Sequence, residues 1–164
     1  MDESSLEERA RRVLEACRRA GERLALAEAS TGGLVSASLT DIAGASAVVE
    51  RGFIPYSNEA KTELLGVPVE LMVAHGAVSE PVALALAQGA LARSHATLAL
   101  AETGIAGPSG GSEAKPVGLV YLAVTRRDGT HVCERHVFTG DRKAIRRAAA
   151  ARGLELLLSL LERS

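Results

Sequence analysis

The stretch LALAEASTGG, residues 24–33, decides the fold class. Residues 24–27 predict a short buried strand, and residues 28–33 predict a turn into a helix over 34–39. A strand that runs through a Ser/Thr/Gly turn into a helix presents backbone N–H groups to an anion. A plain helix cap, with glycines for close packing, is the alternative, and the local sequence leaves both open.

The remaining pattern alternates helices and strands. An amphipathic helix from Ser4 or Ser5 to Ala20 precedes the first strand. Asp128-Gly129 is a strong hairpin turn, so its two flanking strands are antiparallel. We therefore predict the α/β class, as a single three-layer α/β/α domain over residues 1–164 with a mixed sheet. The other expected elements are strands at 48–56, 97–101, 117–125 and 130–138, and helices at 58–65, 69–74, 80–95 and 140–162.

Composition excludes several classes of function. Hydrophobic residues make up 47% of the chain but aromatic residues only 2%, and the net charge is −1. Nucleic-acid binding is not expected, because it needs basic surface or aromatic stacking platforms. No apolar run approaches the ~20 residues of a membrane span, so we expect no membrane partner and a cytoplasmic protein. The cysteine and histidine spacings match no metal site, and we expect neither metal nor cofactor.

Residues 44–61 contain the material of a serine–lysine hydrolase. Ser46 lies in a loop of small residues, and Lys61 falls in the first turn of a helix capped by Ser57 or Asn58. A serine hydroxyl needs a base, and lysine can serve only with a lowered pKa. The positive end of the helix dipole and burial beside Tyr56 would both lower it. On spacing alone, a solvated lysine and a turn serine remain the alternative.

Two further features point to an anionic or amide ligand. The strand at 97–101 leads into the glycine-rich segment 102–111, which lets the backbone approach a ligand closely. Arg142 stands in the first turn of the last helix, where a cation is disfavoured unless an anion faces it. The glycine-rich turns fall at strand ends, where open α/β sheets bind ligands. A mobile surface loop and a solvated arginine are the other interpretations.

The chain resembles the CinA C-terminal family over nearly its whole length. The resemblance rests on these motifs: AE-x-x-TGG (27–33), TD-x-x-G (40–44), Ser46, YSNEAK (56–61), LGV (65–67), HGAVSE (75–80), GIAGP (104–108) and KPVG (115–118). The stand-alone members of that family are nicotinamide mononucleotide (NMN) amidohydrolases. The resemblance implies conversion of NMN and water to nicotinate mononucleotide and ammonia, in NAD salvage.

The resemblance also implies roles for residues. It assigns the nucleophile to Ser46, the lysine to Lys61 and an assisting tyrosine to Tyr56. Arg142 matches a family arginine that would meet the phosphate or the oxyanion. Relatives form dimers, so a homodimer through the Ala/Leu-rich helices is expected. The expected substrate-binding residues are Ser30, Thr31, Gly32, Gly33, Asn58, Thr103, Gly104, Ile105, Ala106, Gly107 and Arg142.

Two departures from the family pattern stand out, one at positions 29 and 30 and one at position 102. The family commonly has Glu-Ser-Cys-Thr-Gly-Gly where this chain has Ala29 and Ser30 after the glutamate. Glu102 stands where an apolar or small residue is more usual. It is either a buried acid with a partner or a residue that alters the choice of substrate. These departures keep two rival hypotheses open. One is a nucleotide-binding module without catalysis, and the other is an amidohydrolase of another small amide.

Overall fold

A five-stranded sheet forms the centre of the computed structural model, which describes residues 3–163. The strand order is β2-β1-β3-β4-β5. Strands β1, β2 and β3 are parallel, whereas β4 pairs antiparallel with both β3 and β5. The mixed sheet and the hairpin at Asp128-Gly129 are thus confirmed. The strands are β1 (Leu24–Glu28), β2 (Val49–Phe53), β3 (Leu98–Gly104), β4 (Leu119–Arg126) and β5 (His131–Val137).

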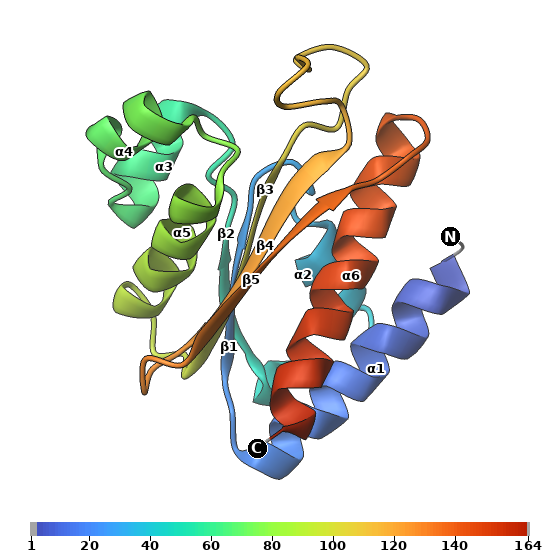
Figure 1. Ribbon diagram of the computed structural model, residues 1–164. Helices are drawn as coiled ribbons and strands as arrows, with labels where there is room; N and C mark the ends of the chain where they lie inside the picture. The colour runs from blue at the N-terminus through green and yellow to red at the C-terminus, as the bar shows by residue number, and fades with distance from the viewer. Residues whose placement is uncertain (1–2, 164) are drawn as a thin grey trace.

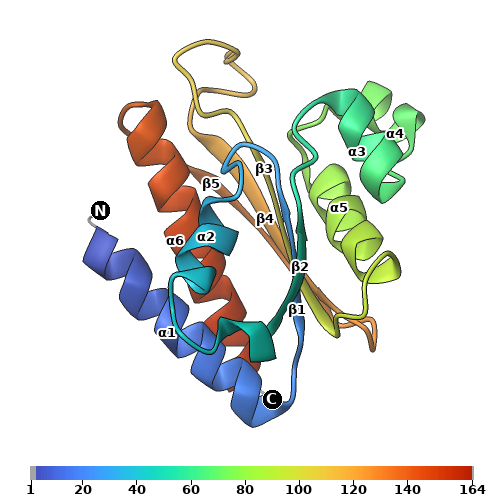
Figure 2. The same cartoon turned by 180° about the vertical axis from the view of Figure 1, so that it is seen from behind.

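Helices cover both faces of this sheet, as Figures 1 and 2 show from opposite sides. One face carries α1, α2 and α6, and the other carries α3, α4 and α5. The three-layer α/β/α architecture is therefore confirmed. The helices are α1 (Glu3–Ala20), α2 (Leu34–Thr40), α3 (Asn58–Leu65), α4 (Val69–His75), α5 (Glu80–Ala92) and α6 (Arg142–Glu162).

Side-chain size differs between the two faces of β1. Leu24 and Leu26 pack into the core under α1 and α6, whereas Ala25 and Ala27 pack against α5. Alternate residues of a strand point to opposite faces, so the LALA sequence makes one thick apolar layer and one thin one. The thin layer lets α5 approach the sheet closely. Close packing continues at Gly89, where an added Cβ would lie 2.1 Å from the carbonyl oxygen of Leu65.

The parallel strands end at the same edge of the sheet, and this edge gathers the segments of interest. Residues 29–33 follow β1, residues 54–57 follow β2 and the long loop 105–118 follows β3. Strand β5 also ends at this edge, and α6 begins there (Figure 1). Segments far apart in the sequence thus meet where α/β sheets bind ligands.

Two elements are shorter than the sequence predicted. The strand expected over 48–56 is only Val49–Phe53, and the helix expected to reach residue 95 ends at Ala92. Strand β2 is an edge strand and Pro55 lies just beyond it, as the missing N–H of proline favours.

Residues 1, 2 and 164 lie outside the described part, including the start of the acidic N-terminus. Within residues 3–163, none of the helices combines the length and apolarity of a membrane span.

Candidate active site

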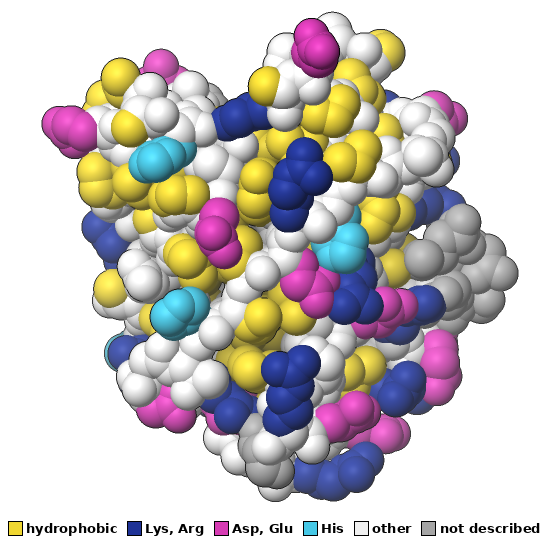
Figure 3. All heavy atoms as spheres, viewed as in Figure 1, with side chains coloured by type: hydrophobic (Ala, Val, Ile, Leu, Met, Phe, Trp, Pro, Cys, Tyr) yellow, Lys and Arg dark blue, Asp and Glu magenta, His cyan; other side chains and the backbone are white. Residues whose placement is uncertain are grey.

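A hollow of about 300 Å³ opens at the strand-end edge of the sheet. Figure 3 shows the corresponding notch between the α3 and α4 region and the loop that follows β3. Lys115 of that loop spans towards α4, donating hydrogen bonds to the carbonyl oxygens of His75 and Val78, the latter at 2.9 Å. The hollow is lined by Ala29, Ser30, Tyr56, Asn58, Lys61, Ala77, Val78, Thr103, Gly104, Ile105, Ala106, Gly107, Ser109, Gly110 and Arg142.

Lys61 contributes a buried amine to this hollow. Ser57 caps α3, accepting a 3.0 Å hydrogen bond from the backbone N–H of Ala60, so Lys61 lies in the first helical turn as predicted. Lys61 is only 3% exposed, and its Nζ donates a 3.1 Å bond to the Tyr56 carbonyl. Burial lowers the pKa of Lys61. The amine can therefore exchange a proton more readily than an exposed lysine.

Ser30 contributes the hydroxyl that is held by a buried carboxyl group. Its Oγ donates a short hydrogen bond to Oε2 of Glu102, which lies on β3. Glu102 is 1% exposed, and burial raises its pKa. The expectation of a buried acid with a partner is confirmed. The partner is Ser30, 72 residues away in sequence.

Glu28 organises the turn that carries Ser30. Its carboxylate accepts bonds from the backbone N–H groups of Val35 and Ser36, at 2.8 and 2.9 Å, at the start of α2. It also accepts a 2.8 Å bond from the hydroxyl of Thr31. Glu28 therefore occupies the helix N-terminus from within the protein, which leaves this end unavailable to an external anion.

Arg142 closes the outer side of the hollow. Asp141 caps α6 by accepting a 2.9 Å bond from the backbone N–H of Ala144. This cap places Arg142 at the first helical position. Its guanidinium donates to the Gly107 carbonyl at 2.8 Å and to the Tyr56 hydroxyl at 3.0 Å. An arginine fixed at a helix N-terminus, beside an open hollow, is suited to bind an anionic group.

Glycine keeps the space beside Ser30 open. A Cβ added at Gly104 would lie 3.0 Å from Ser30 Oγ and 3.1 Å from Glu102 Oε2. Thr103, the preceding residue, donates its hydroxyl proton to the Ala77 carbonyl at 2.9 Å. The Thr103 bond fixes the wall that β3 shares with the segment after α4, and Gly104 leaves room for a ligand next to the serine.

The structure does not bring Ser46 to Lys61. Ser46 lies in the short 3-10 turn Ala45–Ala47, before β2, and borders a separate hollow with Thr40 and Val49. Lys61 follows β2, so the strand separates them. Five residues at about 3.3 Å each place the two ends of β2 about 17 Å apart. The structure therefore does not bring the expected Ser46–Lys61 pair together: within this chain, the serines that line the hollow with Lys61 are Ser30 and the exposed Ser109.

The other expected site residues divide into two groups. Thr31 is fully buried and Gly32 and Gly33 do not line the hollow, so direct ligand contact through them is not supported. The remaining expected contacts do line it, namely Ser30, Asn58, Thr103, Gly104, Ile105, Ala106, Gly107 and Arg142. The lining residues that the sequence did not predict are Ala29, Ala77, Val78, Ser109 and Gly110. Among them, Ala77 is held by the hydrogen bond from Thr103 of β3.

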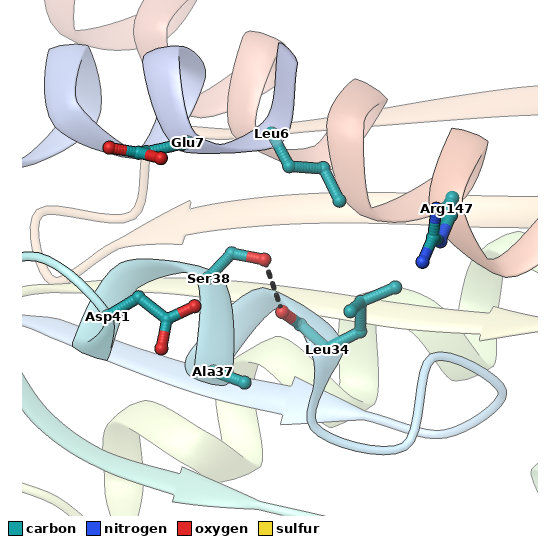
Figure 4. A pocket seen from close by; sticks show the side chains of 7 residues that line it. All are labelled: Leu6, Glu7, Leu34, Ala37, Ser38, Asp41 and Arg147. Carbon is teal, nitrogen blue, oxygen red and sulfur yellow. Dashed lines mark hydrogen bonds between the residues drawn. The ribbon is translucent and has the colours of Figure 1, made fainter. Parts of the chain in front are cut away.

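A different hollow, of about 230 Å³, lies between α1, α2 and α6 (Figure 4). Leu6 and Leu34 supply its apolar surface, and Glu7, Asp41 and Arg147 border it. Ser38 does not offer its hydroxyl proton there, because it donates to the Leu34 carbonyl at 2.7 Å. Across residues 3–163, no three His, Cys, Asp or Glu side chains are grouped to hold a metal ion.

The fold and the site define an α/β domain with a ligand hollow at its strand ends. Residues 6–161 match the model of the CinA C-terminal domain. The chain therefore belongs to the CinA C-terminal domain family.

Similar proteins fall into two size classes. The chain is 47% identical to the nicotinamide-nucleotide amidohydrolase PncC of Escherichia coli K12, over 96% of this chain and 95% of that protein. It is 54% identical over 137 residues to a CinA-like protein of Anaeromyxobacter dehalogenans, of which it spans 33%. A crystal structure of an Agrobacterium tumefaciens competence/damage-inducible protein superposes with a TM-score of 0.93, at 47% identity and 95% coverage of each chain.

Proposed function

We propose that this protein hydrolyses the carboxamide of nicotinamide mononucleotide, giving nicotinate mononucleotide and ammonia. One observation carries the proposal: a single hollow joins the Ser30 hydroxyl, the buried Lys61 amine and the Arg142 guanidinium. A nucleophile, a proton donor and an anion-binding group are what acyl transfer on a phosphorylated amide requires. The name of the E. coli relative, a nicotinamide-nucleotide amidohydrolase, supports the choice of substrate.

Ser30 is the proposed nucleophile, because the other hydroxyl groups of the hollow are less suited. Thr103 gives its proton to a backbone carbonyl, and the Tyr56 hydroxyl, on a residue 60% exposed, accepts a bond from Arg142. Ser109 lies exposed on the loop after β3. Ser30 Oγ would attack the carboxamide carbon, losing its proton as the carbon–oxygen bond forms. Backbone N–H groups of the segment 104–110 would stabilise the oxyanion.

Lys61 is the proposed acid–base group for the departure of ammonia. As an ammonium with a lowered pKa, it would give a proton to the carboxamide nitrogen while the carbon–nitrogen bond breaks, releasing ammonia. The neutral amine would then take a proton from water, whose oxygen attacks the acyl-serine. Ser30 recovers a proton as the nicotinate group leaves, and the site returns to its starting state.

Arg142 is the proposed phosphate-binding residue. Its hydrogen bonds to Gly107 and Tyr56 fix the guanidinium at the mouth of the hollow and leave its charge beside the open space. Binding energy from the phosphate would position the distant carboxamide against Ser30. A substrate without phosphate is therefore expected to lose rate as well as affinity.

Turnover of NMN by the purified protein tests the proposal. Ammonia release and nicotinate mononucleotide formation are measured together, beside the Ser30→Ala variant and with nicotinamide riboside and simple amides as alternative substrates. Both products are expected from NMN with the wild type. Binding of NMN without any turnover would favour the nucleotide-binding module, and faster release from another amide would reassign the substrate.

A cytoplasmic homodimer is the proposed state of the protein. The Ala/Leu-rich face of α5 is not available for the subunit contact, because Val82, Leu86 and Ala90 are buried against the sheet. The exposed apolar side chains of Val69 and Val73 on α4 are better placed, at 54% and 81% exposed. Sedimentation of the wild type beside Val73→Asp tests this arrangement.

A further inference from the structure

A continuous chain of hydrogen bonds runs inward from the hollow to the start of α2. Ser30 Oγ bonds to Oε2 of Glu102, and Oε1 of Glu102 lies 3.0 Å from the Thr31 hydroxyl. The same hydroxyl lies 2.8 Å from Oε1 of Glu28. Glu28 and Glu102 are direct partners in the register of β1 and β3, so strand pairing holds the two carboxyl groups on either side of Thr31.

The number of protons in this chain fixes its direction. Glu28 accepts hydrogen bonds from the backbone N–H groups of Val35 and Ser36 and from the hydroxyl groups of Ser36 and Thr31. Thr31 has one hydroxyl proton and gives it to Glu28. One hydroxyl proton cannot serve both carboxyl groups fully, and a proton on Glu102 Oε1 would satisfy the longer, 3.0 Å contact.

Glu102 is accordingly a neutral acid with two different oxygens. Oε1 carries the proton and is held by the Thr31 backbone N–H at 2.9 Å, whereas Oε2 is free to accept the proton of Ser30. Burial raises the pKa of Glu102 and outweighs the hydrogen bonds from Ser30 and Thr31, which act in the opposite direction, and the charge of Glu28 adds to the increase. The other charged groups nearby are Lys61 across the hollow and Arg146, which binds the carbonyl oxygens of Ser30 and Thr31.

We propose that Glu102 is the catalytic group that takes the proton of Ser30 and that Thr31 and Glu28 complete a proton relay behind it. The inference rests on the proposed acyl transfer and deepens it. As Ser30 Oγ bonds to the carboxamide carbon, its proton moves to Glu102 Oε2. The proton of Oε1 moves to Thr31, and the Thr31 proton moves to Glu28. The reverse transfers return a proton to Ser30 when the acyl group leaves.

This assignment separates two tasks that one lysine cannot perform at the same moment. The relay removes a proton from the nucleophile, while Lys61 supplies a proton to ammonia on the other side of the carboxamide. Lys61 donates a hydrogen bond to the Tyr56 carbonyl, whereas Ser30 donates to Glu102. Ser30 and Glu102, which bond to each other, are two of the three positions at which the sequence differs from the expected family pattern.

The test measures the reactivity of Ser30 without relying on NMN. Phenylmethanesulfonyl fluoride is used as the probe, and its attachment to Ser30 is followed by intact mass and peptide mapping, with Ser30→Ala as the blank. Glu102→Gln keeps the shape of the side chain but cannot pass a proton. We expect labelling and NMN turnover both to fall by about 10²-fold or more. The infrared band of a protonated carboxyl group at neutral pH is expected in the wild type and not in this variant.

A second pair of variants covers the case in which Glu102→Gln fails to fold. Thr31→Val removes the hydroxyl but keeps the shape and the backbone N–H, whereas Thr31→Ser keeps the hydroxyl. We expect Thr31→Val to lower labelling by about tenfold or more and Thr31→Ser to stay close to the wild type. If Thr31 had a purely structural role, both variants would have a lower melting temperature, and their labelling rates would not differ in this way.

The outcomes distinguish the relay from the proposed function. Unchanged labelling in Glu102→Gln and Thr31→Val, or no labelling of Ser30 in the wild type, would overturn the relay. If the wild type turns over NMN while labelling is unchanged in these variants, the amidohydrolase activity is supported and the proton relay is refuted. Labelling that depends on Glu102 and Thr31, in a protein that does not turn over NMN, would support the relay and refute the substrate.

Discussion

Arg142 donates a 3.0 Å hydrogen bond to the hydroxyl of Tyr56, a residue 86 positions earlier in the chain. A second bond, of 2.8 Å, goes to the carbonyl of Gly107 in the loop after β3. The first turn of α6 is thereby joined to the segments that follow two strands of the sheet. A guanidinium held in this way loses little further side-chain freedom when it binds an anion.

Replacing Arg142 by Gln is predicted to weaken phosphate binding selectively. Loss of a charge-assisted contact of about 1.5–3 kcal/mol would raise the KM for NMN by roughly 10- to 100-fold. The KM for nicotinamide riboside is expected to change little, because it has no phosphate. Lys143→Gln is the matched control, since Lys143 is the next cation of the same turn, is exposed and does not line the hollow. Equal losses with both substrates would contradict the phosphate role.

Replacing Lys61 by Met is predicted to abolish turnover while stabilising the fold. Burial lowers the pKa of Lys61 below its ordinary value of 10.5, so the folded protein binds this proton less tightly than the unfolded chain. The free energy of unfolding therefore rises with pH from the folded pKa up to about 10.5. Methionine removes that dependence and should add about 1 kcal/mol at neutral pH. Denaturant melts of both proteins at several pH values measure it, and a less stable variant would contradict the prediction.

Replacing Glu102 by Gln is predicted to flatten the pH dependence of stability on the acid side of neutrality. The pKa of Glu102 is raised above 4.5 in the folded protein. Its stabilising contribution is complete below pH 4.5 and is lost as the pH rises through the folded value. The wild type should therefore lose more stability than the variant between pH 4.5 and neutrality. Parallel stability curves for the two proteins would show that Glu102 is ionised in the folded state.

The ion pair of Glu134 and Arg152 is predicted to make the fold sensitive to acid. Arg152 donates bonds of 2.7 and 2.8 Å to this carboxylate and lowers its pKa to about 2. The resulting stability is present above pH 4.5 and is lost as the pH falls towards 2. Because both side chains are partly exposed, we expect a loss of about 1 kcal/mol in Glu134→Gln at neutral pH.

The acid melt separates this pair from the rest of the protein. Wild type and Glu134→Gln should converge in stability as the pH approaches 2, since the carboxylate is then protonated in both states. Glu162→Gln is a suitable control, because its contact with Arg12 is longer, at 3.5 Å, and more exposed. A gap that persists at pH 2 would assign the effect to packing.

Local sequence signals predicted much of the fold because they act over a few residues. Asp128-Gly129 determined the hairpin, and the cap at Ser57 placed Lys61 in a first helical turn. Alternation of Leu and Ala in β1 predicted a buried strand but not which face each side chain joins. That assignment depends on the helices that pack on either side.

The composition of the site was predicted less well, because strand direction decides it. Ser46 and Lys61 are only 15 positions apart, yet β2 lies between them and carries them to opposite edges of the sheet. Ser30 and Glu102 are distant in sequence and meet because β1 and β3 pair in register. The available signal was an acidic residue at the end of a buried strand, beside a serine where the family commonly has cysteine.

The most direct measurement is ammonia release from NMN by the wild type, Ser30→Ala and Ser46→Ala, each shown to be folded by circular dichroism. We predict that Ser46→Ala releases ammonia at close to the rate of the wild type. Ser30→Ala is expected to lose about 10³-fold or more. Activity that survives in Ser30→Ala and disappears in Ser46→Ala would contradict the assignment of the nucleophile to the hollow beside Lys61.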